Sequence, residues 1–121
     1  MKMDVFEYYD CWLLYSIGFS KKGSSLREIL ISGDFYNHAV FTLEKLNYGM
    51  SKLIENGYVV KNGERFVATK KARKFHRKNS KFGEGHIEML FRVAPIFQKE
   101  IAKSGCTQIE YFTEDENGNT K

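Results

Sequence analysis

The chain has 121 residues, of which 42% are hydrophobic, and it carries a net charge of +4 at pH 7. A chain of this length most simply forms one domain, and it buries enough surface to fold without a disulfide or a metal. The acidic N-terminus is not typical of a signal peptide, and no apolar run approaches the roughly 20 residues that span a membrane. The two cysteines, Cys11 and Cys106, make no disulfide framework. We therefore expect a cytoplasmic protein.

The first predicted helix covers residues 5–17. Asp4, with Glu7 three residues later, is typical of a helix start because each side chain can accept a hydrogen bond from an exposed backbone N–H. Apolar residues then recur at helical spacing, and further apolar residues widen that surface: Val5, Phe6, Tyr9, Trp12, Leu13, Leu14, Tyr15 and Ile17. We therefore expect a helix that is buried on more than one side and ends in segment 18–23.

The second predicted helix follows a capping-box pattern made by Ser25 and Glu28. It presents Leu26, Ile29 and Leu30 to the core, and we expect it to close at Gly33-Asp34. Residues 34–41, DFYNHAVF, leave two interpretations open. They form either an extra turn of helix or an ordered loop that is packed by its aromatic side chains.

The third predicted helix starts after Thr42, a good N-cap, and ends at Asn56-Gly57, a C-cap signal. Its buried stripe consists of Leu43, Leu46, Met50, Leu53 and Ile54. The opposite face carries Glu44, Lys45, Asn47, Tyr48, Ser51, Lys52 and Glu55, and we expect it to point outward.

A hairpin and a basic helix follow. The strands are expected at residues 58–61 and 65–68, and Asn62-Gly63 between them is a strong two-residue turn signal. Thr69 then caps a short basic helix that we expect to run through Phe75.

Positive charge is concentrated in residues 61–81. This segment holds nine basic residues and one acid, a net charge of +8, whereas the rest of the chain sums to −4. A focused basic segment favours a polyanionic partner. The alternative interpretation is a solvated, lysine-rich helix face that only keeps the protein soluble.

The C-terminal part, residues 79–121, is expected to pack on the domain formed by residues 1–78. Residues 79–85 predict a linker, and helical spacing of apolar residues then starts at His86. Pro95 is expected to kink this helix or to start a new one, because it lacks an N–H. Residues 107–113 are a candidate strand, and the polar tail after them is expected to be disordered.

One pattern in this sequence consists of Leu53, Gly57, Tyr58, Val59, the Asn62-Gly63 turn, Thr69 and Ala72. This pattern resembles that of the winged helix-turn-helix superfamily, in the style of MarR and PadR-type bacterial regulators. The resemblance covers about residues 4–78 and implies a mainly α fold with a small β-hairpin (α+β), extended by a C-terminal helix. It also implies that residues 42–56 are the recognition helix and residues 58–68 the wing. In dimeric members of this superfamily, long terminal helices form the dimer interface. The resemblance implies that residues 86–103 form such an interface here.

The resulting prediction is a DNA-binding transcription regulator. The expected major-groove contacts are Lys45, Asn47, Tyr48, Ser51 and Lys52, because polar side chains on an outward helix face read base edges. The expected phosphate contacts are Lys61, Arg65, Lys70, Lys71 and Lys74, which supply affinity without sequence information. The expected partners are double-stranded DNA and, through the C-terminal helix, a second copy of the chain.

Two other classes of function are alternatives to DNA binding. A protein-interaction or dimerisation module without DNA contact is favoured by an aromatic excess, which comprises Phe6, Tyr8, Tyr15, Phe19, Phe35, Tyr36, Phe82 and Phe91. An enzyme is disfavoured, because Cys11, Asp34, His38 and His76 stand in no recognisable catalytic or metal-binding spacing. We accordingly expect no cofactor and no metal.

Overall fold

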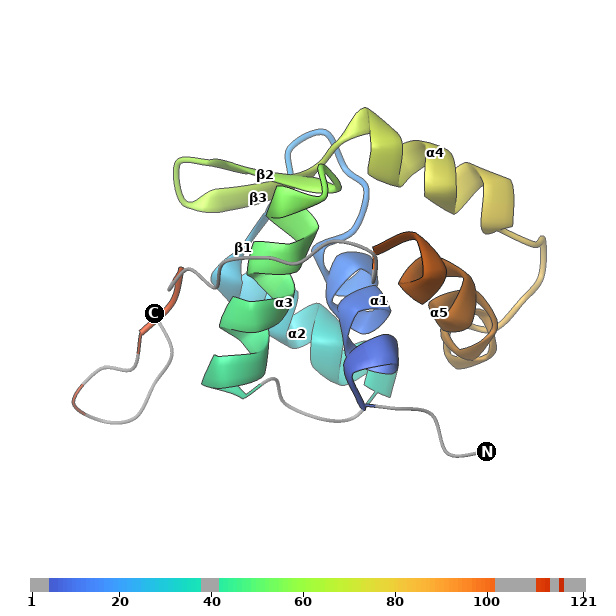
Figure 1. Ribbon diagram of the computed structural model, residues 1–121, viewed down its shortest axis with the longest axis horizontal. Coiled ribbons are helices and arrows are strands. Elements are labelled where there is room, and N and C mark those ends of the chain that lie inside the picture. The colour runs from blue at the N-terminus through green and yellow to red at the C-terminus, as the bar shows by residue number, and fades with distance from the viewer. Residues whose placement is uncertain (1–4, 38–41, 102–110, 114–115, 117–121) are drawn as a thin grey trace.

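The computed structural model describes residues 5–37, 42–101, 111–113 and 116, and it describes side chains within residues 9–33, 42–85, 88–101, 111–113 and 116. These residues form five helices and one three-stranded antiparallel sheet, as Figure 1 shows. The prediction of a mainly helical α+β chain is therefore confirmed.

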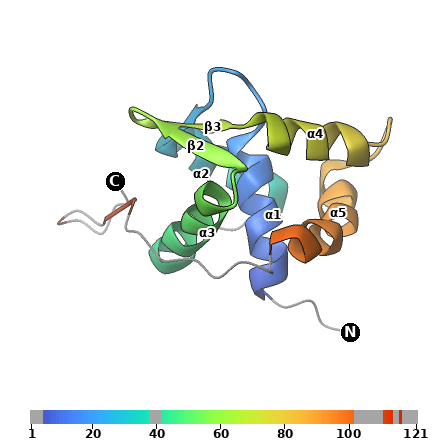
Figure 2. The same cartoon turned by 45° about the horizontal axis from the view of Figure 1, so that its top comes forward.

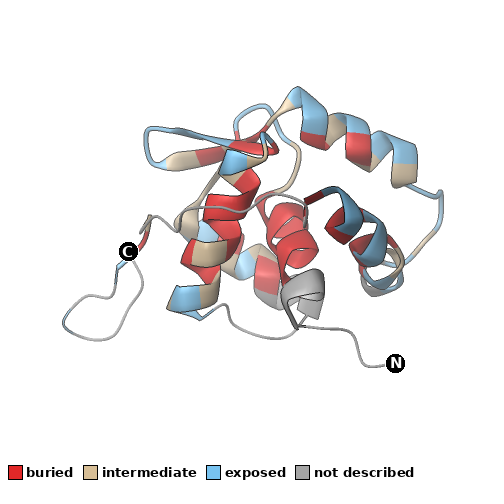
Figure 3. Cartoon of the chain, viewed as in Figure 1, coloured by how far each residue is buried: buried red, intermediate tan, exposed pale blue. Residues whose placement is uncertain are grey.

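Helix α1 (Val5–Ile17) is the centre of the fold. It packs against α2 (Leu26–Asn37), α3 (Leu43–Glu55) and α5 (His86–Ile101), and it lies between α3 and α5 in Figures 1 and 2. Every residue of 9–17 is buried, so the predicted burial on more than one side is confirmed. Figure 3 shows the buried faces of α1, α3 and α5 turned toward one another.

Helix α2 does not close at Gly33-Asp34, so that prediction is wrong. It continues to Asn37, which makes residues 34–37 the extra helical turn, and residues 38–41 lie outside the described part of the chain. The indole Nε1 of Trp12 donates a 2.9 Å hydrogen bond to the carbonyl oxygen of Gly33, which is itself buried.

Helix α3 lies against α1 at a close approach. A Cβ at Gly49 would lie 2.9 Å from Cδ2 of Leu13, so the absence of a side chain allows the two helices to meet. The predicted caps are present. The Thr42 hydroxyl accepts a hydrogen bond from Lys45 N at 3.3 Å, and Asn56 ends the helix.

The sheet has the order β1 (Ser24–Ser25), β3 (Arg65–Ala68), β2 (Val59–Asn62). The hairpin of β2 and β3 was predicted, but its turn lies one residue later than expected. Asn62 pairs with Arg65, so Gly63 and Glu64 are the central turn residues. Primed turns require a positive φ at the first central residue, and Gly63 has a φ of 62°. Strand β1 was not predicted, because two residues are too few to show an alternating pattern.

Helix α4 (Lys70–Asn79) is longer than predicted, since it continues past Phe75. Helix α5 runs without interruption through Pro95, so the alternative of a new helix there is wrong. Pro95 lies on the exposed side of α5, where water can satisfy the carbonyl that proline leaves without a donor. The opposite side of α5 buries Leu90, Val93, Ala94, Phe97 and Ile101, and α5 packs mainly on α1.

The linker and the C-terminal segment also differ from expectation. Arg92 of α5 ties the linker down, because its guanidinium donates to both carboxylate oxygens of Glu84 and to the Asn79 carbonyl. Residues 111–113 form no strand, and the rest of the candidate strand, residues 107–110, lies outside the described residues.

Candidate nucleic-acid interface

The outward face predicted for α3 is only partly outward. Lys45 and Tyr48 are half-buried, whereas Asn47, Ser51 and Lys52 are 2%, 2% and 6% exposed. The prediction that these last three side chains face a partner in the major groove is therefore wrong for this structure. Each of them has a partner within the chain.

Lys52 is used in a buried ion pair. Its Nζ lies 2.5 Å from Oδ2 of Asp10 on α1, and both side chains are almost inaccessible. Burial raises the pKa of Asp10, although the hydrogen bond and the charge of Lys52 act in the opposite direction. The Lys52 ammonium group is therefore not available to a phosphate or a base.

Asn47 is used to hold the C-terminal segment. Its Oδ1 accepts hydrogen bonds from the backbone N–H groups of Tyr111 and Phe112, and its Nδ2 donates to the Phe112 carbonyl. Ser51 donates its hydroxyl to the Asn47 carbonyl one turn earlier in the helix. A helical face pattern cannot reveal a partner more than 60 residues away, so this contact could not be predicted from the spacing of residues along α3.

The exposed charged side chains of α3 are acidic. Glu44 and Glu55 are exposed at the two ends of the helix, whereas Lys45 is half-buried with its Nζ 5.5 Å from the centre of the Tyr9 ring. In the described structure α3 therefore presents no basic row to a nucleic acid.

Helix α4 has the opposite character. It contains six basic residues and no acid, and it buries Ala72 and Phe75 against the domain. Lys70, Lys74 and Arg77 are spaced four and three residues apart, which places them in one row along the exposed side of the helix. The three side chains form no hydrogen bond or ion pair with any described residue. We call Lys70, Lys74 and Arg77 the outer row of α4.

Two of the five predicted phosphate contacts already have partners. Arg65 donates to the carbonyls of Lys22 and Gly23 and pairs with Glu28 at 2.9 Å. Lys71 donates to the Asn56 carbonyl at 2.8 Å and lies 4.4 Å from the centre of the Tyr58 ring. The other three, Lys61, Lys70 and Lys74, are exposed and have no such bond within the described residues.

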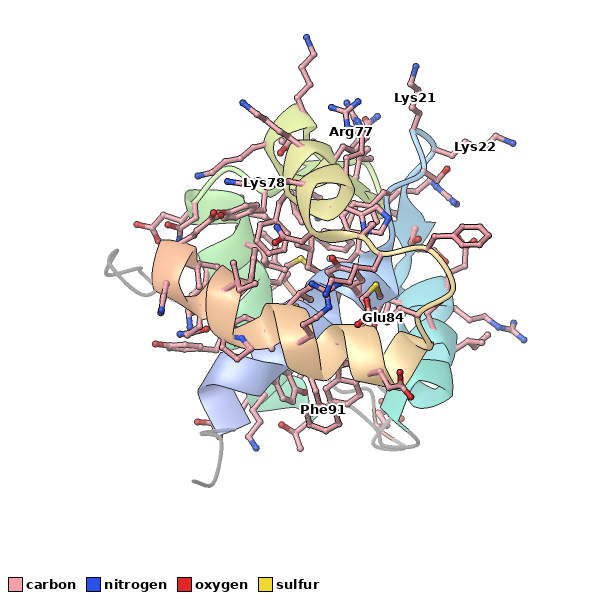
Figure 4. The ribbon with its side chains drawn as sticks, turned by 90° about the vertical axis from the view of Figure 1, so that its right-hand side faces the viewer. Lys21, Lys22, Arg77, Lys78, Glu84 and Phe91 are labelled. Carbon is pink, nitrogen blue, oxygen red and sulfur yellow. The ribbon has the colours of Figure 1, made fainter. Side chains whose placement is uncertain are left out.

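The structure adds Lys21 and Lys22, which were not predicted as phosphate contacts. Both project from the loop after α1, on the same side of the molecule as Arg77 in Figure 4. The loop is fixed to α4 by Phe19, whose ring stacks on His76 with centroids 4.2 Å apart and planes 6° apart. Arg65 holds its other end through the carbonyls of Lys22 and Gly23. These contacts join two sequence segments into one basic surface.

A groove of about 600 Å³ lies between α4 and α5. Its walls carry the lysines Lys71, Lys74, Lys78 and Lys99, together with Tyr58, Phe75 and Glu100. The Tyr58 hydroxyl donates to Glu100 at 2.7 Å. The groove is therefore predominantly positive and continues the charge of α4 onto the neighbouring helix.

The residues weighed for catalysis show no catalytic arrangement in the described structure. Cys11 is fully buried, and burial raises the pKa of its thiol, which disfavours the thiolate nucleophile. His76 is half-buried between aromatic rings, and burial lowers its pKa. The side chains of Asp34 and His38 and the whole of Cys106 lie outside the described residues, among which no three metal-ligating side chains are grouped to hold an ion.

None of the helices in the described residues combines the length and hydropathy needed to cross a membrane.

Comparisons with known proteins identify no family for this chain. Comparison of the chain with protein-family models, with curated proteins and with solved structures finds no match. The function of the interface therefore has to be inferred from the geometry described above.

Proposed function

We propose that this protein is a non-enzymatic, cytoplasmic regulator of winged-helix type that binds double-stranded DNA through its phosphate backbone. The observation that carries the proposal is the outer row of α4, three cations that face solvent with no ion-pair partner among the described residues. Lys21 and Lys22 extend the row onto the adjacent loop. Clustered cations on one face are the electrostatic footprint of a nucleic-acid-binding protein.

Binding through phosphates is consistent with the small number of side chains that α3 can offer to DNA. Phosphate contacts set position and affinity, whereas base contacts set specificity. With Asn47, Ser51 and Lys52 buried, the described conformation offers little to read a base sequence. We therefore expect weak discrimination between DNA sequences and strong dependence on salt.

The salt dependence is the quantitative test. Neutralising five phosphates with Lys21, Lys22, Lys70, Lys74 and Arg77 gives a slope of roughly −4.5 for log affinity against log salt. Fluorescence anisotropy with a random-sequence duplex, at salt concentrations from about 50 to about 200 mM, measures it. Lys70→Ala/Arg77→Ala removes two of the contacts and should reduce the slope to about −2.7.

A matched control is available on the same chain. Arg27→Ala/Lys81→Ala also removes one arginine and one lysine, both exposed, but neither lies on the outer row or in the walls of the groove. Its slope should stay that of the wild type. Equal losses in the two double variants, or binding that does not respond to salt, would contradict a phosphate contact by α4.

A second candidate is a dimerisation module without DNA contact. Phe91 and Ile96 on α5 are 51% and 40% exposed, and Phe82 in the preceding linker is fully exposed. Because the buried face of α5 already packs on α1, a second copy would have to use this outer side. Analytical ultracentrifugation of wild type and Ile96→Glu tests it, since a dimer through this side should dissociate in the variant.

A further inference from the structure

Among the described residues, Asn47 of α3 forms hydrogen bonds with the C-terminal segment. The Asn47 Oδ1 accepts from Tyr111 N at 2.8 Å and from Phe112 N at 2.9 Å, and its Nδ2 donates to the Phe112 carbonyl at 3.0 Å. All three hydrogen bonds go to backbone atoms. Asn47 therefore recognises main-chain atoms and does not depend on which side chains that main chain carries. Because the N–H groups of two consecutive residues share one acceptor, the main chain is bent at this point.

Selectivity comes from an aromatic anchor. Phe112 is 4% exposed, and its ring lies 5.3 Å from that of Phe66 on β3. The Tyr111 ring makes an edge contact with the same Phe66 at 6.3 Å. A cavity of about 270 Å³ borders these rings and includes Lys61 on its rim.

We propose that Asn47 and Phe66 form a receptor for an aromatic segment of main chain, that the chain's own Tyr111-Phe112 fills it, and that this segment closes α3 to DNA. The receptor stands on the contacts above, and the closing of α3 rests in addition on the proposed DNA binding. Asparagine is one of the two side chains that pair bidentately with adenine. The same amide cannot bind Phe112 and a base at once, so occupation by the segment excludes reading by Asn47.

The proposal predicts two states. In the closed state only the phosphate contacts of α4 and its neighbouring loop operate, and in the open state Asn47 is also available. The apparent affinity of a site is reduced by the fraction of molecules in which the site is competent. Any partner that offers an aromatic segment able to make the same main-chain hydrogen bonds would compete with residues 111–112 and open α3.

The receptor is tested without DNA. In the 121-residue chain, Phe112→Ser removes the anchor, whereas Tyr111→Pro keeps Phe112 but removes one donor to Asn47 and the edge contact of the Tyr111 ring with Phe66. A synthetic peptide of residues 108–116 is added to each protein, and the side-chain amide signal of Asn47 is followed by NMR. The peptide should bind the Phe112→Ser variant and shift this signal, and it should bind the wild type at least about tenfold more weakly because the site is filled.

Two controls decide the result. The same peptide with serine in place of its phenylalanine should not bind, and Asn47→Ala added to Phe112→Ser should abolish binding of the natural peptide. Circular dichroism establishes that the variants are folded. Failure of the peptide to bind folded Phe112→Ser and folded Tyr111→Pro, or equal binding in the presence and absence of Asn47, would overturn the receptor.

The closing of α3 is tested with DNA. A duplex pool selected on Phe112→Ser should bind that variant at least about tenfold more tightly than it binds the wild type, because the open fraction rises. Adding Asn47→Ala should remove the gain and leave the salt slope of the wild type. If Phe112→Ser binds no more tightly while Lys70→Ala/Arg77→Ala still weakens binding, the closing of α3 is wrong and the phosphate contact stands. If the α4 variant has no effect either, the proposed function itself fails.

Discussion

Helices α3 and α4 both carry polar and basic side chains on the face away from their apolar stripe, yet the structure uses the two faces in opposite ways. On α3, Lys52 pairs with Asp10 and Asn47 binds the C-terminal segment. On α4, Lys70, Lys74 and Arg77 point to solvent without a partner among the described residues. The difference shows that residue type does not decide whether a polar face serves the fold or a ligand. The presence of a complementary group elsewhere in the chain decides it.

The two faces should also differ in what they contribute to stability. A buried ion pair and a buried amide become costly when one partner is removed, since the other is then left without compensation. Like charges three or four residues apart on a helix repel one another slightly. We therefore expect changes on α3 to affect unfolding and changes on the outer row of α4 to affect binding.

The largest effect is expected for Lys52→Ala. It leaves the Asp10 carboxylate buried without its cation, and breaking a buried pair in this way costs about 3–5 kcal/mol. Urea denaturation followed by circular dichroism measures the change. The double variant Asp10→Ala/Lys52→Ala should recover part of the loss, because no unpaired charge then remains. Equal stability of Lys52→Ala and wild type would show that the pair is not buried.

A smaller loss is expected for Asn47→Ala. The change leaves the N–H and carbonyl of Phe112 without their partner, and a buried polar group left in this state costs about 1–3 kcal/mol. Lys45→Ala, two residues earlier on the same helix, should change stability by less than about 0.5 kcal/mol. The same urea titration compares the two variants, and equal losses would contradict the holding role of Asn47.

The contact between α4 and the loop after α1 should make stability depend on pH. Burial lowers the pKa of His76 below its ordinary 6.5, so as the pH falls the unfolded chain binds the proton first. The stability that neutral His76 contributes is fully present above pH 6.5 and is lost as the pH falls from there through the lower pKa of the folded state. In His76→Phe, which keeps a ring against Phe19, the melting temperature should fall less between pH 7 and 5. An equal fall in melting temperature between pH 7 and 5 in the two proteins would contradict this role of His76.

The local pattern of the sequence was enough to predict much of the fold. Thr42 and Thr69 cap the helices they were expected to cap, and the Ser25–Glu28 capping box is present in both directions. These signals involve residues within one turn of each other. Gly33, inside α2, accepts a hydrogen bond from Trp12, 21 residues earlier in the chain, and local spacing contains no information about that contact.

The candidate site was predictable to the extent that it is local. The basic segment and its helix were recognised, because Lys70 and Lys74 need only exposure to act as cations. Lys52 and Asn47 were placed on the wrong side of α3, because their partners lie 42 and about 65 residues away in the chain. Lys21 and Lys22 join the interface through Phe19 and Arg65, which are again long-range contacts.

The smallest expected change in stability, and the clearest contrast with α3, belongs to the outer row of α4. Lys70→Ala/Arg77→Ala removes two exposed cations with no partner among the described residues, and alanine is a better helix former than either residue. Surface changes of this kind shift the free energy of unfolding by no more than about 0.5 kcal/mol. Relief of like-charge repulsion makes a slight gain the expected direction at low salt, and that gain should disappear at high salt because screening weakens the repulsion. Urea denaturation at two salt concentrations measures both effects. A loss comparable to that of Asn47→Ala would mean that the outer row, like the face of α3, serves the fold.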